Sequence, residues 1–112
     1  MLALAVTVEA IRNAIHAGQW RSSSHARFNA VARHIAEAEL VATIAGGEII
    51  EDYPTDPRGA SALVLGHAPG GRPLHVVCTM DPGGTLLVIT AYEPRMPWWT
   101  DERTRTPKGG ST

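Results

Sequence analysis

The sequence predicts an α+β domain in which two or three N-terminal helices pack on a four-stranded antiparallel sheet. Two observations predict this class. Before Gly46, apolar residues recur with the spacing of a helix. After Glu48, short runs rich in Val, Ile, Leu and Thr alternate with turns rich in Gly and Pro, which is typical of strands. Because these turns are too short for the crossovers that parallel strands need, we expect antiparallel pairing.

Helical stretches are expected in the N-terminal half of the chain. Thr7 can cap the first helix, and Gly18 can end it. A connection at Trp20–Ser24 follows, and one of its serines can cap the second helix. The stretch Glu37–Ala45 is either a third helix or an extension of the second. The apolar positions that define these stretches are Val8, Ile11 and Ile15, then Phe28, Val31 and Ile35, then Leu40, Val41 and Ile44.

The expected strands are Glu48–Tyr53, Ala62–His67, Arg72–Met80 and Thr85–Tyr92. If Asp81–Gly84 forms the hairpin loop, Met80 lies opposite Thr85, and counting back places His75 opposite Thr90. His75 and Thr90 then lie on an open sheet face, together with Tyr92 and with Gly66 beside the histidine. The opposite face is expected to form the core with Leu63, Leu65, Leu74, Val76, Cys78, Met80, Leu87, Ile89 and Ala91.

The length and composition fit one domain. With 112 residues and 44% hydrophobic content, we expect a single domain over 1–107 and a disordered end at 108–112. A single cysteine excludes an internal disulfide framework and indicates a reducing compartment, so we expect the cytoplasm. The apolar start at 1–8 is too short for a membrane anchor and lacks the basic flank of a signal peptide, so no membrane partner is expected. We also expect no cofactor and no metal, because the Cys and His spacing of a zinc site is absent from the sequence.

The charges are segregated along the chain although the formal net charge is only -1. Residues 10–36 contain arginines and histidines but no carboxylate, whereas residues 37–56 contain carboxylates but no Lys or Arg. Such segregation predicts either a basic patch that attracts an anionic ligand or ordinary solvated faces. Almost all the basic side chains are arginine, which suits bidentate contacts to phosphate and is equally explained by codon bias.

Several short landmarks resemble a bacterial family of uncharacterised small domains in the RelE-like nuclease superfamily, which also contains barnase, EndoU and colicin tRNases. The resemblance covers about residues 23–105. Two positions depart from it: the chain has Asn29-Ala30 where the family usually has Arg-Met, and Thr100–Arg103 where it has an aromatic residue. The matching landmarks are His25-Ala26, Arg33, Ile35, Gly47–Pro54, Leu63–Gly66, Gly71–Val77, Ile89-Thr90, Tyr92–Pro94 and Trp99.

This resemblance implies a RelE-like fold and a toxin of a toxin-antitoxin pair that cuts RNA without a metal. Such cleavage needs a base, an acid and cations at the phosphate. We expect the candidates to converge in one shallow basic cleft between the second helix and the open sheet face. The implied partners are RNA, on or off the ribosome, and an antitoxin protein, with a zinc-finger antitoxin as one candidate. The candidate residues are His25, His75, Thr90 and Tyr92 for catalysis, and Arg27, Arg33, Arg103 and Arg105 for binding RNA.

Structural roles explain the same residues and stay open. His25 can cap a helix, and His75 can form a cross-strand hydrogen bond. Trp98-Trp99 can be a hydrophobic lid or a platform for base stacking. The alternative function is therefore a non-catalytic RelE-like module that binds a protein through the sheet face or the acidic edge at 48–56. The near-neutral pI and Asn29 favour this alternative, whereas the acid-free helical front favours the nuclease.

Overall fold

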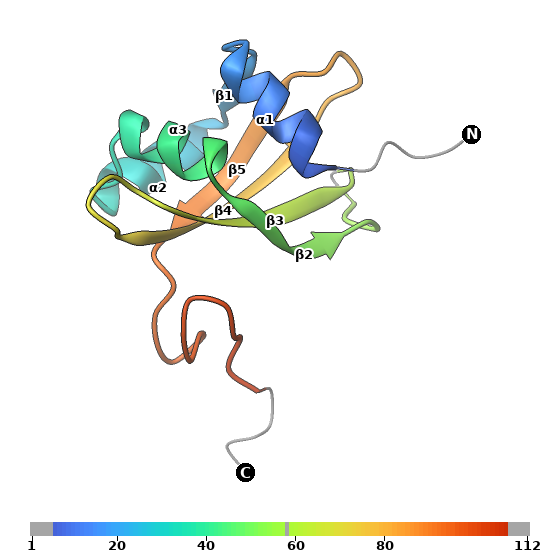
Figure 1. The fold of residues 1–112 in the computed structure, drawn as a ribbon. Helices are drawn as coiled ribbons and strands as arrows, with labels where there is room; N and C mark the ends of the chain where they lie inside the picture. Colours follow the sequence, from blue (N-terminus) through green and yellow to red (C-terminus); the bar gives the residue numbers. More distant parts are fainter. Residues whose placement is uncertain (1–5, 58, 108–112) are drawn as a thin grey trace.

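The structure, a computed structural model, describes residues 6–57 and 59–107. It has three helices on one face of a five-stranded sheet, while the segment after the last strand covers the other face (Figure 1). The α+β class and the N-terminal placement of the helices are confirmed. Residues 108–112, for which we predicted disorder, lie outside the described residues.

The helices are α1 (Val8–His16), α2 (Ser24–Ala32) and α3 (Glu37–Ala45). The predicted caps of the first two are present: the side-chain oxygens of Thr7 and Ser23 accept from backbone N–H groups of the first turn, at 3.1 and 3.0 Å.

A tight turn makes α3 a separate helix and not an extension of α2. His34 has a φ of 57°, in the left-handed region that ends helices. The next residue, Ile35, donates its backbone N–H to the carbonyl of Ala30 at 2.8 Å, which closes the end of α2. The turn therefore fixes where the His34 side chain leaves the backbone.

The sheet contains β1 (Trp20–Ser22), β2 (Glu48–Tyr53), β3 (Ser61–His67), β4 (Pro73–Met80) and β5 (Leu86–Tyr92), in the order β1-β5-β4-β3-β2. The four predicted strands are present and pair antiparallel. The prediction of a purely antiparallel, four-stranded sheet is wrong, because β1 adds a fifth strand that runs parallel to β5. The short turns exclude parallel pairing only between consecutive strands, whereas β1 and β5 are separated by most of the chain.

The predicted register between β4 and β5 is also wrong. Met80 lies opposite Leu86, because Thr85 belongs to the loop and donates its backbone N–H to the Asp81 side chain at 2.9 Å. A further shift occurs between Val77 and Cys78. Their partners on β5 are Thr90 and Val88, so Ile89 is the extra residue of a β-bulge. As a result, His75 lies opposite Tyr92 and not opposite Thr90.

The core lies between the helices and one sheet face. We predicted Leu63 and Leu65 as core residues, and this is wrong. They share the opposite sheet face with His75 and are buried there. Gly66 lies on the helix side, where an added Cβ would approach the backbone oxygen of Thr43 to 2.1 Å, so this glycine serves helix packing and not a ligand. The strand residues of the core are Ala62, Val64, Leu74, Val76, Cys78, Leu86, Val88 and Ala91.

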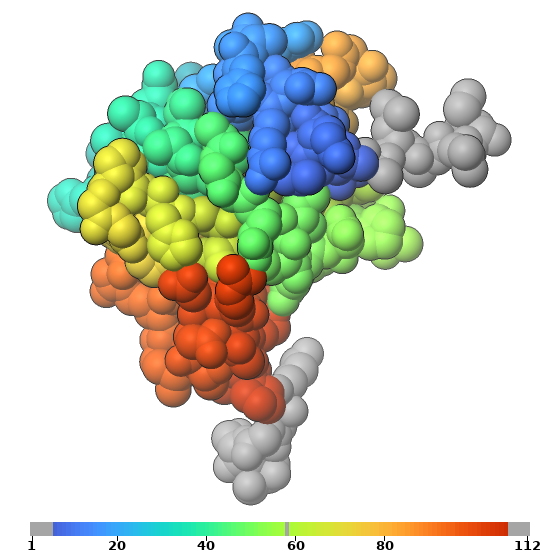
Figure 2. Space-filling view, viewed as in Figure 1, coloured from blue at the N-terminus to red at the C-terminus, as the bar shows by residue number. Residues whose placement is uncertain are grey.

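The second sheet face is covered by residues 94–107, here called the C-terminal segment, so the expectation of an open face is wrong. Trp99 is only 3% exposed and pairs in an isolated antiparallel bridge with Arg105. Figure 2 shows this segment packed against the side of the sheet away from the helices. The prediction that the tryptophan pair forms a hydrophobic lid is therefore confirmed for Trp99, whereas Trp98 is 71% exposed.

Among the helices of the described residues, none combines the length and the apolar character that a bilayer span requires.

Candidate functional site

A cleft of about 670 Å³ lies where the end of α2, the end of β5 and the C-terminal segment meet. We call it the arginine–tryptophan cleft. It combines cationic, aromatic and acid–base side chains. The lining residues are Arg33, His34, Tyr92, Glu93, Arg95, Trp98, Trp99 and Arg105.

Three arginines and one glutamate line the cleft, and Arg33 is the one of these arginines whose acceptors within the described residues are all neutral. Arg33 Nη1 donates to the carbonyl oxygen of Ala91 at 2.7 Å and to Thr90 Oγ1 at 3.4 Å. Both acceptors are neutral, so they orient the guanidinium without cancelling its charge. Arg95 donates to Glu93 at 3.2 Å and is otherwise exposed. The cleft can therefore attract an anion such as a phosphate.

Arg105 has a structural role at the floor of the cleft. It donates to both carboxylate oxygens of Glu51, at 2.7 and 3.2 Å, and to the Tyr53 hydroxyl at 3.4 Å. Its guanidinium also lies 4.6 Å from the ring centre of Trp99. The ion pair holds the pKa of Glu51 below its ordinary value. Arg105 thus fixes the C-terminal segment to β2 and closes one side of the cleft.

His34 and Glu93 bring an imidazole and a carboxylate to the same cleft. Arg72, from the turn before β4, joins the two sides: its Nη2 donates to the His34 carbonyl at 3.1 Å, and its Nε lies 3.9 Å from Glu93 Oε1. The Glu93 carboxylate therefore lies between the guanidiniums of Arg72 and Arg95. This arrangement places a candidate base and a candidate acid beside the cations.

The aromatic residues of the cleft have two different roles. Trp98 lines the cleft and is 71% exposed, so its ring is available for stacking on a flat ligand. Trp99 is buried, and its ring meets that of His75 edge-on at 4.3 Å. Burial raises the pKa of Tyr92, which keeps its hydroxyl protonated.

The structure contradicts the prediction that His75 faces a ligand. His75 is fully buried, and its Nε2 lies 2.7 Å from the Glu102 carbonyl oxygen, while its Nδ1 lies 3.3 Å from the Tyr92 hydroxyl. Burial also lowers its pKa, which keeps the imidazole neutral. The C-terminal segment covers this residue, so the interpretation as a structural hydrogen bond is the one that the geometry supports.

The predicted convergence of His25 with His75 is wrong as well. His25 belongs to α2, which lies on the helix side of the sheet (Figure 1), and its Nε2 accepts from Asn29 Nδ2 at 2.9 Å. His75 alternates with Leu74 and Val76 of the core, so it points to the other face. Asn29, which departs from the expected family pattern, is thus the partner of His25.

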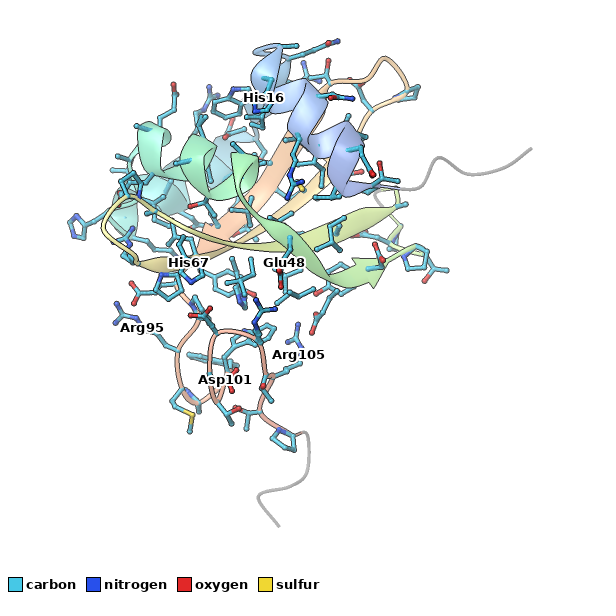
Figure 3. The ribbon with its side chains drawn as sticks, viewed as in Figure 1. His16, Glu48, His67, Arg95, Asp101 and Arg105 are labelled. Atoms are coloured by element: carbon cyan, nitrogen blue, oxygen red, sulfur yellow. The ribbon has the colours of Figure 1, made fainter. Side chains whose placement is uncertain are left out.

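The remaining candidates are divided among three places. Arg33, Tyr92 and Arg105 line the arginine–tryptophan cleft, and Thr90 touches it through Arg33. Arg27 lines a separate groove beside β1. Arg103 forms an ion pair with Glu48 on β2. Figure 3 shows Asp101 and Arg105 on the C-terminal segment, with Glu48 and His67 on the facing strands.

Sequence reasoning did not select His34, Glu93 or Arg95 as site residues. A signal existed in the run Tyr92–Trp99, where glutamate, arginine and aromatic residues follow the last strand. No comparable signal marked His34, because its position depends on the turn that ends α2.

Comparison with curated proteins and with solved structures finds no match to this chain. Comparison with protein families finds one described as "Domain of unknown function (DUF4258)", which matches residues 22–93. The matched region ends at Glu93, so it includes the α2 and β5 side of the cleft but not the C-terminal segment. Because the match spans well over half of the 112 residues, the chain belongs to the DUF4258 family of domains of unknown function.

Proposed function

We propose that this protein is a RelE-like, metal-independent endoribonuclease of toxin type, which cuts single-stranded RNA in the arginine–tryptophan cleft in the cytoplasm. One observation carries the proposal: cations, an exposed tryptophan, a carboxylate and an imidazole line the same cleft. A partner antitoxin would hold the activity in check, as the resemblance of the sequence to RelE-like domains implies.

The binding chemistry supports a nucleotide as the ligand. The guanidiniums of Arg33 and Arg95 suit the phosphate, because arginine can donate two parallel hydrogen bonds to its oxygens. The exposed face of Trp98 suits a base, because any base of a single strand can stack on an aromatic ring. Duplex RNA would not present an unstacked base to this ring.

The chemistry of cleavage needs one group to take the proton of the ribose 2'-hydroxyl and another to protonate the departing 5'-oxygen. We assign Glu93 as the base and His34 as the acid. The 2'-oxygen forms a bond to phosphorus while the bond to the 5'-oxygen breaks, which yields a 2',3'-cyclic phosphate and a free 5'-hydroxyl. Arg33 and Arg95 stabilise the negative charge that develops on the phosphate oxygens.

The test is cleavage of a single-stranded RNA by the purified protein in EDTA, with and without ribosomes. We expect cleavage by the wild type and a loss of about a hundredfold or more in His34→Asn, since one acid–base group contributes that much. Asparagine tolerates the left-handed backbone at this position, so the fold is preserved. His25→Ala is the matched control and retains full activity, because His25 lies outside the cleft.

Two outcomes would contradict the nuclease. The first is that the wild type cuts no RNA under either condition. The second is that His34→Asn and Glu93→Gln both cut RNA as fast as the wild type. Expression in bacteria provides an independent test, since the wild type is expected to arrest growth and His34→Asn is not.

A second function, RNA binding without cleavage, is favoured by one observation: neither His25 nor His75, the histidines that the resemblance implies, reaches the cleft. In that case the wild type binds RNA without cutting it, and Trp98→Ala weakens the binding.

A further inference from the structure

A second groove, of about 530 Å³, lies beside β1 and is separate from the arginine–tryptophan cleft. We call it the β1 groove. It is formed by the edge strand, the outer side of α2 and the start of α3. The lining residues are Trp20, Arg21, Ser22, Arg27, Ala30, Val31, Ile35, Glu37 and Leu40.

The outer side of α2 is unusually apolar for a surface helix. Val31 in the groove is 78% exposed, and Phe28, one turn earlier on the helix, is 73% exposed. Only Ala26 of α2 is buried, although Phe28 and Val31 belong to the apolar spacing that predicted this helix. An exposed apolar surface of this kind marks a place where another molecule binds.

Within residues 6–57 and 59–107, no strand pairs with the outer edge of β1, so its backbone groups there face the same groove. Gln19 accepts from Leu86 at 3.0 Å, and Ser23 donates to Val88 at 3.1 Å, so these residues point toward β5. Backbone groups alternate sides along a strand, so those of Trp20 and Ser22 point away from β5, toward the open edge. A partner strand can therefore add to the sheet here.

The charge around the groove selects the partner. Arg21 and Arg27 are exposed and have no ion pair or hydrogen-bond partner for their side chains among residues 6–57 and 59–107. Glu37, at the first turn of α3, is the one carboxylate of the groove lining. Two free guanidiniums flanking apolar side chains fit an extended segment in which acidic and aliphatic residues alternate.

We propose that the β1 groove binds an extended acidic–aliphatic segment of a partner protein, which pairs with β1 as an added strand. A protein segment fits better than RNA, because an open strand edge and exposed aliphatic side chains recognise backbone and aliphatic groups. RNA binding would call for a larger number of cations. This proposal does not depend on nuclease activity in the arginine–tryptophan cleft.

The experiment titrates the protein with an acetylated and amidated hexapeptide of alternating Val and Glu. NMR spectra recorded at each addition monitor the backbone amides of the protein. We expect saturable shifts at Trp20, Ser22 and the residues of α2. The double variant Arg21→Ala/Arg27→Ala is expected to raise the Kd about fivefold, since each lost exposed ion pair weakens binding modestly. Both arginines are exposed, so we expect the variant to fold like the wild type. An unchanged unfolding midpoint verifies this.

Matched peptides separate the contributions. The same hexapeptide with Lys in place of Glu tests charge, and one with N-methyl groups at alternate backbone nitrogens tests strand pairing. We expect both to bind at least fivefold more weakly. Trp98→Ala is expected to bind the peptide normally, because Trp98 lies in the other cleft. Absence of RNA cleavage by a wild-type protein that still binds the peptide would therefore count against the proposed nuclease alone.

Three results would overturn the proposal: no saturable shifts at β1, equal binding of the Glu, Lys and N-methylated peptides, or stronger shifts of the same amides by a uridine hexanucleotide. The last result would assign the groove to RNA.

Discussion

The imidazole of His75 on β4 donates a hydrogen bond of 2.7 Å from Nε2 to the backbone carbonyl of Glu102 in the C-terminal segment. A carbonyl oxygen only accepts, so the proton of the neutral ring is on Nε2, and Nδ1 accepts from the Tyr92 hydroxyl at 3.3 Å. One buried side chain thus joins the sheet to the segment that forms half of the arginine–tryptophan cleft.

Replacing His75 with alanine is expected to lower the free energy of unfolding by about 2–4 kcal/mol, because it leaves polar groups unsatisfied and a cavity beside Trp99. Chemical denaturation measures the change. His25→Ala, on the exposed side of α2, is the control and is expected to stay within about 0.5 kcal/mol of the wild type. Equal stability of the two variants would show that the His75 hydrogen bond does not hold the C-terminal segment.

Stability is expected to depend on pH through His75. Burial lowers its pKa below the ordinary value of 6.5, so the unfolded chain takes up this proton first as the pH falls. Its contribution is complete above about pH 6.5 and is lost as the pH falls through the lowered pKa of the folded state. We expect the free energy of unfolding to fall more steeply between about pH 7 and about pH 5 in the wild type than in His75→Gln. Parallel profiles would contradict this assignment.

Two adjacent glycines are expected to respond differently to alanine. A Cβ at Gly47 would lie 2.5 Å from Val64 Cγ1 and 2.7 Å from the backbone oxygen of Thr43, whereas a Cβ at Gly46 would lie 3.7 Å from the backbone oxygen of Ala42. Gly47→Ala should therefore destabilise the protein by about 1–3 kcal/mol, and Gly46→Ala by less than about 0.5 kcal/mol. Thermal unfolding of both variants tests the close contact of α3 with the sheet, and similar midpoints would argue against it.

The adjacent tryptophans are expected to separate binding from folding. Trp98→Ala should weaken binding of a single-stranded oligonucleotide about tenfold, since stacking on an aromatic ring contributes about 1–3 kcal/mol per base, and should leave stability unchanged. Trp99→Ala should lower the free energy of unfolding by about 3 kcal/mol or more, because the ring is buried. Fluorescence anisotropy and denaturation provide the two measurements. If Trp98→Ala bound RNA as tightly as the wild type, the stacking role would be excluded.

Local sequence patterns predicted the regular elements well. The strand at Glu48–Tyr53 and the helix at Glu37–Ala45 have the predicted bounds, because their periodicity and the flanking glycines are local signals. β1 was missed, since three residues carry no periodicity and their strand character comes only from pairing with β5, more than sixty positions later.

The candidate site depended on longer-range features. Arg33, Tyr92 and Arg105 were selected from the sequence and line one cleft. His75 and His25 were selected too, but the bulge in β5 and the cover over the second sheet face could not be inferred from residue spacing.

By itself, the sequence determined the α+β class, the order of the helices and of the four longer strands, and their turns, because these follow from patterns within a few residues. Only the tertiary structure decided which side chains share a cleft. A β-bulge in β5 shifts the register in which the end of this strand pairs with β4. The C-terminal segment buries His75 and brings Trp98 and Arg95 beside Arg33. These contacts join residues far apart in the chain, and their geometry depends on how the whole fold packs.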